Sequence, residues 1–286
     1  MAAIVLQTEI ELKTFIKKVK NKGLNIGFVP TMGCLHEGHL DLVQASKNKS
    51  DITIVSIYVN PTQFGKNEDF SSYPSPLKAD IELCNQRGVD AIFIPSTKLL
   101  YPEKLSYSTQ IIVPTISKKL CGKTRKNFFR GVCMVVLRLF NLVQPDQAYF
   151  GEKDYQQLFI IKKMVRDLFL NIEILGCPTR REASGLALSS RNKYLSTNEK
   201  EKASSIHASF KKISSLISTE IYDSEILIKS VESIILDSGI DIDYFEILNQ
   251  QSFRKSKIVT TESRVFFGGY MGKTRLIDNF SLSTSF

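Results

Sequence analysis

The sequence lacks several patterns that mark common protein classes. No run of 18 consecutive apolar residues occurs, because the most apolar stretch, 131–143, is interrupted by Arg138, so we expect no membrane partner. The first eleven residues have no basic region and already include Glu9, which argues against a secretory signal. Neither the G-x-x-x-x-G-K-[ST] loop nor the G-x-G-x-x-G fingerprint is present. These two absences argue against a P-loop kinase and weaken the case for a dehydrogenase.

The cysteines are few and far apart, and no C-x-x-C pair occurs among Cys34, Cys84, Cys121, Cys133 and Cys177. A zinc knuckle or a redox dithiol is therefore not expected. Reduced thiols are typical of proteins in a reducing compartment, so we predict a soluble, cytoplasmic protein.

Basic residues exceed acidic ones, 38 to 29, which gives a formal net charge of +9. This excess favours anionic partners, but it does not separate nucleic acids from phosphate-containing or acidic small molecules. Residues 118–130 carry many of the basic side chains and no acidic one. Two interpretations of that segment stay open, a solvated loop and an arm over a phosphate site. Because no RRM, KH or zinc-finger signature is present, we expect no nucleic acid partner.

Apolar residues make up 43% and charged residues 23%, as in an ordinary globular protein. Up to about residue 175, short apolar runs alternate with amphipathic stretches of helical length. This alternation indicates an α/β fold with a parallel sheet covered on both faces. The expected strands are 24–29, 52–59, 91–94, 148–150 and 172–175, and the expected helices are 39–47, 77–87, 131–143 and 155–168.

After residue 177 the pattern changes to polar helices followed by short strands. We predict helices at 197–214 and 223–237, and strands at 243–248, 264–270 and 275–278 with turns at Gly268-Gly269 and Gly272. The chain is therefore expected to form two domains, 1–176 and a smaller α+β domain, 177–286.

The most informative motif is His36-Glu37-Gly38-His39, where a strand ends and a helix begins. Backbone N–H groups and the helix dipole make such a helix start a phosphate site, and two imidazoles there can donate to phosphate oxygens. The chain has three histidines, and the third, His207, is expected at the surface of a polar helix. A metal site on the pair is disfavoured because no third ligand is nearby in sequence.

Three further motifs contain residues suited to binding anions. Asn60 and Gln63 follow the second strand and can recognise hydroxyl and carboxylate groups. In 150–157 a strand runs into a glycine turn and a helix, and Gly151, Lys153 and Gln157 are the candidate ligands, while Asp154 is placed as a helix cap. Finally, Ser189-Ser190-Arg191 forms a plausible polyphosphate clamp.

In this order and spacing the four motifs closely resemble the pantothenate synthetases (pantoate–β-alanine ligases), a family of H-x-G-H nucleotidylyltransferases. The resemblance covers nearly the whole chain and includes the late motif 275–279. It implies a Rossmann-like doubly wound N-terminal domain, a C-terminal domain that closes over the site, and a homodimer.

The resemblance also implies the reaction and its substrates, ATP, pantoate and β-alanine. The pantoate carboxylate attacks the α-phosphate of Mg-ATP to give pantoyl adenylate and pyrophosphate. The amine of β-alanine then displaces AMP to form pantothenate. Mg²⁺ is expected on phosphate oxygens, and no protein ligand for it is assigned.

The residue roles come from the same resemblance. His39 and His36 are the expected catalytic residues, and Gln63, Gln157 and Asn60 the expected pantoate contacts, with Gln63 also close to the β-alanine position. The expected ATP-binding residues are Met32, Gly33, Cys34, Leu35, Glu37, Gly38, Gly151, Glu152, Lys153, Asp154, Arg180, Leu188, Ser189, Ser190 and Arg191.

The sequence departs from the family pattern where Phe128 replaces a common histidine and Ser184 a common aspartate. The segment 118–126 is also unusually basic. None of these changes touches the histidine pair, so we expect activity to be retained. The alternative is another H-x-G-H nucleotidylyltransferase with a different acceptor.

Overall fold

The computed structural model describes residues 2–65, 68–103, 108–218, 220, 222–283 and 285. They form two compact units. The first comprises Met1–Glu152 and Gln156–Pro178, and the second comprises Lys153–Tyr155 and Thr179–Phe286. The domain division at 176/177 remains a prediction, and the short stretch Lys153–Tyr155 is grouped with the second unit.

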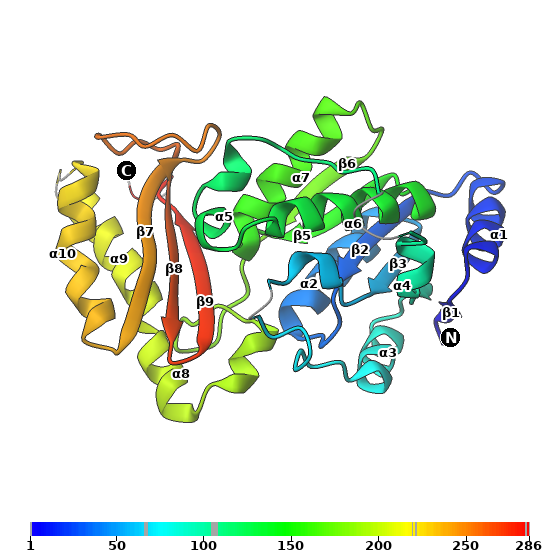
Figure 1. The fold of residues 1–286 in the computed structure, drawn as a ribbon, viewed down its shortest axis with the longest axis horizontal. Helices are drawn as coiled ribbons and strands as arrows, with labels where there is room; N and C mark the ends of the chain where they lie inside the picture. The colour runs from blue at the N-terminus through cyan, green and yellow to red at the C-terminus, as the bar shows by residue number, and fades with distance from the viewer. Residues whose placement is uncertain are drawn as a thin grey trace. The chain divides into compact units, whose positions relative to one another are not determined.

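The first unit is built on a six-stranded parallel sheet in the order β1-β4-β3-β2-β5-β6 (Figure 1). Its strands are β1 Ile4–Leu6, β2 Ile26–Thr31, β3 Ile52–Ile57, β4 Ala91–Phe93, β5 Gln147–Gly151 and β6 Glu173–Cys177. Its helices are α1 Glu9–Lys20, α2 Glu37–Lys49, α3 Leu77–Gln86, α4 Thr97–Leu100, α5 Cys121–Thr124, α6 Phe128–Val143 and α7 Tyr155–Asp167, with short 3₁₀ helices η1 Pro61–Gln63, η2 Ile116–Lys118 and η3 Glu152–Asp154.

Helices cover both faces of this sheet, as the apolar strands require. Phe28, Ile54 and Ile92 in the central strands are fully buried. From β2 the chain moves through α2 to β3, whereas from β5 it moves through α7 to β6, in the opposite direction across the sheet. Right-handed crossovers therefore place α2 and α7 on opposite faces, and the sheet is doubly wound with its switch point between β2 and β5.

The second unit contains a three-stranded antiparallel sheet, β7-β8-β9, with helices packed on it. Its elements are η4 Ser190–Tyr194, α8 Thr197–Ala203, α9 Ser205–Ile217, α10 Ser224–Leu236, β7 Ile240–Asn249, β8 Ser263–Met271 and β9 Thr274–Ser281. Helix α10 packs against α9 and β7 around a core that includes Phe210 and Phe267. The predicted fold class, a parallel doubly wound sheet with a smaller α+β part, is thus confirmed.

Two local predictions in the second unit are wrong. Gly268 and Gly269 form no turn, because they lie inside β8 opposite Tyr244 and Ile242. A Cβ at Gly268 would collide with the Tyr244 ring, so this glycine allows close cross-strand packing. The expected single helix 197–214 is two helices, since α8 ends at Ala203 and α9 begins at Ser205.

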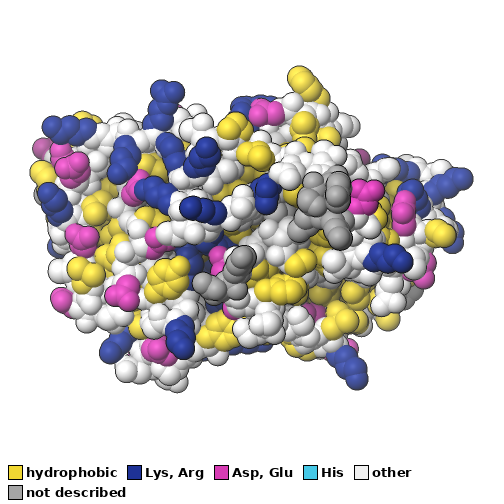
Figure 2. Space-filling view, in the orientation of Figure 1, with side chains coloured by type: hydrophobic (Ala, Val, Ile, Leu, Met, Phe, Trp, Pro, Cys, Tyr) yellow, Lys and Arg dark blue, Asp and Glu magenta, His cyan; other side chains and the backbone are white. Residues whose placement is uncertain are grey.

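Charged side chains of both signs lie on the displayed face of the molecule. Lys and Arg side chains lie across the displayed face with Asp and Glu among them (Figure 2). Within the described ranges, no helix is both long and apolar enough to span a bilayer.

Candidate active site

The switch point of the first unit brings two of the predicted motifs to neighbouring strands. Strand β2 leads into the H-x-G-H loop, and the adjacent β5 leads into Gly151 and Glu152. In open parallel sheets the ligand crevice lies at this point, beyond the carboxyl ends of the strands. The arrangement therefore favours a ligand site at the end of β2 and β5.

The loop after β2 is held in an unusual backbone conformation. Thr31 Oγ1 donates to the Ser56 carbonyl at 2.8 Å and accepts from the Gly33 N–H at 3.1 Å. Gly33 and Cys34 both have positive φ, 79° and 50°. Glycine adopts a positive φ without strain, but Cys34 does not. Other contacts must therefore stabilise the backbone of the loop at Cys34.

Asp80 supplies those contacts, and sequence reasoning missed it. Its side chain is almost fully buried, and its two oxygens accept from the N–H groups of Cys34 and Leu35, each at 2.8 Å. Charge-assisted bonds of this kind are about twice as strong as neutral ones. No local pattern marks Asp80, because an acid in the first turn of a helix is ordinary.

The two histidines lie where the sequence placed them, at the start of α2. His36 is the N-cap residue, and both rings are half-buried with centroids 4.1 Å apart and planes at 34°. The His36 N–H donates to His39 Nδ1 at 3.4 Å. In a neutral His39 ring the proton therefore lies on Nε2, which can donate to an anion at the helix N-terminus.

The residues around the pair differ in their exposure to solvent. Cys34 and Leu35 are buried, Met32 and Gly38 are half-buried, and Glu37 is exposed. The Glu37 carboxylate forms an ion pair with Arg87 at 3.0 Å. Any ATP contact from Glu37 would thus compete with this ion pair.

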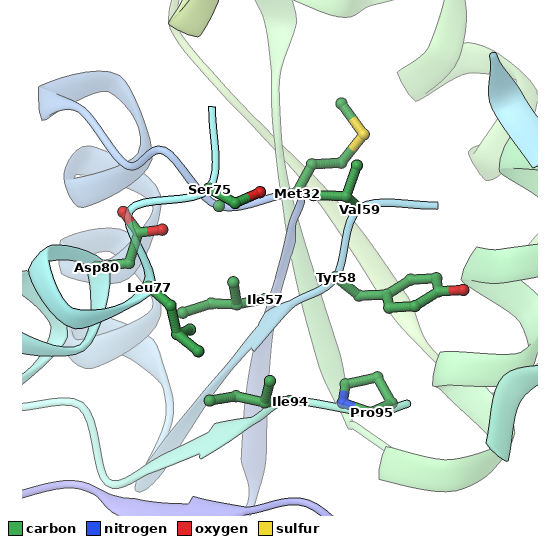
Figure 3. A pocket seen from close by; sticks show the side chains of 10 residues that line it. Met32, Ile57, Tyr58, Val59, Ser75, Leu77, Asp80, Ile94 and Pro95 are labelled. Atoms are coloured by element: carbon green, nitrogen blue, oxygen red, sulfur yellow. The ribbon is translucent and has the colours of Figure 1, made fainter. Parts of the chain in front are cut away.

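A pocket opens at the ends of β2, β3 and β4 (Figure 3). Its walls are mainly apolar. The hydroxyl of Tyr58 donates to Thr97 Oγ1, and burial raises the pKa of this hydroxyl, which therefore stays neutral. The lining residues are Met32, Gly33, Ile57, Tyr58, Val59, Ser75, Leu77, Asp80, Ile94 and Pro95.

Asn60 and Gln63, which flank and form η1, are both buried and bonded to each other. Asn60 Nδ2 donates to Gln63 Oε1 at 3.1 Å and to the Gly131 carbonyl at 3.2 Å. Asn60 Oδ1 accepts from the Tyr101 hydroxyl at 2.8 Å and from Thr62. All polar atoms of the Asn60 amide thus bind protein groups, and its direct contact with a substrate stays a prediction.

The bond from Asn60 fixes the orientation of the Gln63 amide. Because Oε1 accepts from Asn60, the Gln63 N–H₂ group points the other way, where Nε2 donates to Met32 Sδ at 2.8 Å. Gln63 therefore offers donors, which suit the oxygen atoms of a carboxylate or a hydroxyl.

The basic segment 118–130 is not a solvated loop. It includes the end of η2, α5 and the first turn of α6, and its exposed residues are Lys118, Lys123, Thr124, Lys126 and Asn127. Gln156, which the sequence analysis did not single out, fixes it from α7. Its Nε2 donates to the carbonyls of Ile116 and Lys119 at 2.9 and 2.7 Å, and its Oε1 accepts from the Cys121 N–H at 3.2 Å. The other interpretation, an arm over a phosphate site, stays a prediction.

The third motif lies after β5. A Cβ at Gly151 would meet no atom of the described residues within 4 Å, so this glycine leaves open space above the strand end. Glu152 is half-buried in η3, and Gln157 is half-buried in the first turn of α7. Open space beside a backbone turn suits the close approach of a ligand.

In the second unit, the late motif fixes the backbone of Lys153. Asn279 Nδ2 donates to the Lys153 carbonyl at 2.8 Å. Asp278 accepts two bonds from Arg181, at 2.6 and 3.0 Å. The Lys153 ammonium lies 3.8 Å from Asp154 Oδ1 and is largely buried. The motif at 275–279 thus positions Lys153 and the segment after Thr179.

The serine–arginine motif lies in the same unit. Ser189 caps η4 by accepting from the Arg191 N–H at 3.3 Å, and Ser190 is buried. Arg180 is exposed, and its carbonyl accepts from the Leu188 N–H at 2.9 Å. The backbone therefore holds Arg180 and Leu188 opposite each other.

His207, expected at the surface, is only partly exposed. The imidazole is half-buried, packs against the rings of Phe210 and Phe280, and would touch a Cβ at Gly185. Burial and the nearby Arg181 lower its pKa. The sequence did not predict this contact because α9 is mostly polar, and His207 packs on the one apolar face of the helix.

No group of three or more His, Cys, Asp or Glu side chains that could hold a metal occurs in the part of the chain that the structure describes. All five cysteines are free thiols and buried.

Comparison with known proteins fits this geometry. The family model described as pantoate-beta-alanine ligase matches residues 4–281. The pantothenate synthetase of Caldicellulosiruptor saccharolyticus is 47% identical over 270 residues, which cover 94% of this chain and 95% of that protein. The pantothenate synthetase of Caldicellulosiruptor bescii is 46% identical over 277 residues, which cover 96% and 98%.

Solved structures agree with the sequence relatives. Pantothenate synthetase from Thermus thermophilus has a TM-score of 0.91 at 36% identity and covers 98% of this chain and 99% of its own. The pantoate-beta-alanine ligase of Francisella tularensis, complexed with beta-gamma ATP and beta-alanine, has a TM-score of 0.82 at 37% identity and covers 98% of both chains. With matches of this extent in both sequence and fold, the chain belongs to the pantoate–β-alanine ligase family.

Proposed function

We propose that the chain condenses (R)-pantoate with β-alanine to form pantothenate, with ATP cleaved to AMP and pyrophosphate. Activation is needed because a carboxylate becomes an acylating agent only when one oxygen is made a good leaving group. Adenylation achieves this, and attack by the β-alanine amine then breaks the acyl–phosphate bond. The observation that carries the proposal is the histidine pair at the start of α2, at the switch point of a ligase-family fold.

His36 and His39 are proposed to bind the ATP phosphates and stabilise the charge that develops as pyrophosphate leaves. The Nε2–H of His39 is suited to this because its Nδ1 is occupied by the His36 N–H. Donors fixed before the reaction stabilise a transition state without reorganising, which makes positioning the main source of catalysis.

The acceptor is proposed to be held by Gln63 and Gln157. The oriented N–H₂ group of Gln63 supports this role, since pantoate presents a carboxylate and two hydroxyl groups. Asn60 positions Gln63 and is proposed to remain near the substrate. The other proposed nucleotide contacts are Met32, Gly33, Cys34, Leu35, Glu37, Gly38, Gly151, Glu152, Lys153, Asp154, Arg180, Leu188, Ser189, Ser190 and Arg191.

Mg²⁺ is proposed to enter with ATP and to neutralise phosphate charge there, held by phosphate oxygens. Magnesium commonly binds through substrate phosphates with few protein ligands.

The enzyme is further proposed to be a cytoplasmic homodimer with small-molecule substrates and neither nucleic acid nor membrane partners. Five free thiols support a reducing compartment. Light scattering after size exclusion should give twice the chain mass of 32.3 kDa.

The deciding experiment measures pyrophosphate release from Mg-ATP, first with pantoate alone and then with β-alanine added. We expect release to require pantoate, and AMP and pantothenate to appear on adding β-alanine. Release that requires a phosphorylated acceptor instead would favour the other interpretation, an H-x-G-H nucleotidylyltransferase with a different substrate. Neither reaction, in folded protein that binds ATP, would overturn the proposal.

A further inference from the structure

Within the basic segment 118–130, Arg125 contacts a carboxylate, a backbone carbonyl and an aromatic ring. Its Nε donates to Glu68 Oε1 at 2.8 Å and its Nη2 to Glu68 Oε2 at 2.5 Å. Two parallel bonds between a guanidinium and a carboxylate fix direction as well as distance. The ion pair thus joins the stretch after α5 to the segment that follows η1.

This pair is shielded from solvent more than a surface ion pair is. Only 10% of the Arg125 side chain and 25% of the Glu68 side chain are exposed. The guanidinium lies 3.7 Å from the centre of the Phe128 ring, which covers one of its faces. Phe128, where the family resemblance led us to expect a histidine, thus gives Arg125 an aromatic surface.

Arg125 also reaches the residue proposed to bind pantoate. Its Nη2 donates to the backbone carbonyl of Gln63 at 3.2 Å. The side chain of Gln63 is held separately by Asn60. Gln63 is therefore held both at its amide, through Asn60 and Met32, and at its backbone, through Arg125.

The same segment is tied to the second proposed pantoate contact. Gln156 binds the backbone at Ile116, Lys119 and Cys121, and it precedes Gln157 in α7. Residues 116–128 thus connect η1, which bears Gln63, with the first turn of α7, which bears Gln157. Arg125 is the point where that connection meets η1.

We propose that Arg125 is a positioning residue that, paired with Glu68 and stacked on Phe128, sets the backbone of Gln63 for pantoate binding. The inference rests on the proposed function, in which Gln63 contacts pantoate. Arg125 acts through Gln63 and Glu68, so its loss should weaken the use of pantoate and spare that of ATP.

The test compares Arg125→Gln, Arg125→Lys, Glu68→Gln and the double variant Arg125→Gln/Glu68→Gln with Lys126→Gln. Lys126 is exposed on the same segment and its replacement removes the same charge, so it is the matched control. We expect the pantoate KM to rise about 10- to 100-fold in both Arg125 variants, with the ATP KM within about twofold, since small displacements of positioning groups have effects of this size. Arg125→Lys should fail to rescue because an ammonium cannot form the two parallel bonds. The double variant should be within about twofold of Arg125→Gln, since the two side chains act as one unit.

Three results would overturn the proposal. An equal rise in pantoate KM for Lys126→Gln, or full activity of Arg125→Lys, would mean that only positive charge matters. A rise in ATP KM matching that for pantoate would mean that Arg125 serves the nucleotide. If Arg125→Gln does not fold, Glu68→Gln alone decides, and an unchanged pantoate KM in that variant would reject the role of the pair. Wild-type protein lacking pantoate-dependent pyrophosphate release would instead contradict the proposed function.

Discussion

At the scale of single residues, the hydrogen bond between the two histidines determines what His39 can do. Because Nδ1 of His39 accepts from the His36 N–H, Nε2 is the donor toward phosphate. His39→Ala should lower pantoate-dependent pyrophosphate release by about 10²- to 10⁴-fold, the usual contribution of a positioned acid or donor. His39→Gln, which keeps an N–H donor, should retain more activity than His39→Ala. Near-normal release by a folded His39→Ala variant would exclude the role.

Asp80 gives a second prediction at this scale, one about stability. Asp80→Asn replaces an accepting oxygen by an N–H₂ group that would face the N–H of Cys34 or Leu35. We expect the free energy of unfolding to fall by about 2–3 kcal/mol, as for a lost buried hydrogen bond to a charged group. Urea unfolding measures this. Asp90→Asn, in the same unit but half-buried, is the control expected to cost less, and equal losses would mean that the loop contact is not special.

A site residue can be predicted from the sequence when its role depends on residues that are its neighbours in the chain. The histidine pair was placed correctly because a strand end, a turn and a helix start follow one another in sequence. Asp80 lies 46 residues from Cys34, and Arg125 lies 57 residues from Glu68. Their roles exist only once the chain has folded, and a single sequence without aligned relatives carries no signal for such pairs. Asn60 was singled out for its amide, yet the fold uses that amide internally.

At the scale of elements, long apolar strands and amphipathic helices were predicted to within a few residues. The structure extends β5 and β9 and begins α6 at Phe128. Strand β1 and helix α1 were not predicted, because the three residues of β1 are too few to show a period. Helix α1 did carry a usable signal, a capping box in which Thr8 and Glu11 bond to each other's backbone N–H groups.

The contact between α6 and η1 yields a prediction about a whole element. Gly131 lies so close to the backbone of Thr62 and Gln63 that an added Cβ would collide with it. Gly131→Ala should therefore displace η1, cost about 1–3 kcal/mol of stability as overpacking does, and raise the pantoate KM. Thermal unfolding and steady-state kinetics measure the two effects. Asn141→Ala, at an exposed position of α6, should change neither, and normal kinetics in Gly131→Ala would show that η1 tolerates the shift.

At the scale of the whole molecule, the net charge bears on which ligands the protein attracts, and the burial of the thiols bears on their reactivity. The chain has a net charge of +9, and the face shown in Figure 2 carries both basic and acidic side chains. The thiols are instead protected, since burial raises the pKa of Cys84 and Cys133 to about 12. Both therefore stay protonated and unreactive in the folded protein at neutral pH. The excess of positive charge favours anionic substrates.

The stability of the second unit should depend on pH through His207. Its folded pKa is lowered from 6.5, first by burial, then by Arg181 and Lys211, with Asp278 opposing. Among the described residues, its Nδ1 has no hydrogen-bond partner. A lowered pKa means that the unfolded chain binds the proton more readily than the folded one. The stability that the neutral ring contributes is therefore complete above 6.5 and is lost as the pH falls through the folded pKa.

The direction of this pH dependence can be tested by urea unfolding at a series of pH values below and above 6.5. His207→Gln removes the titrating group and should flatten the decline of stability just below that value. Carboxylates that titrate at lower pH should still unfold both proteins in acid. The exposed Lys211→Gln variant is no substitute, because it changes only a neighbouring charge and should leave most of the decline. A decline of the same size in His207→Gln would assign the pH dependence to other groups.

If the ring does act as proposed, protonation would force a cation against Phe210 and Phe280 and loosen the segment at Gly185 that precedes Ser189 and Arg191. Just below 6.5, activity should then fall more in the wild type than in His207→Gln.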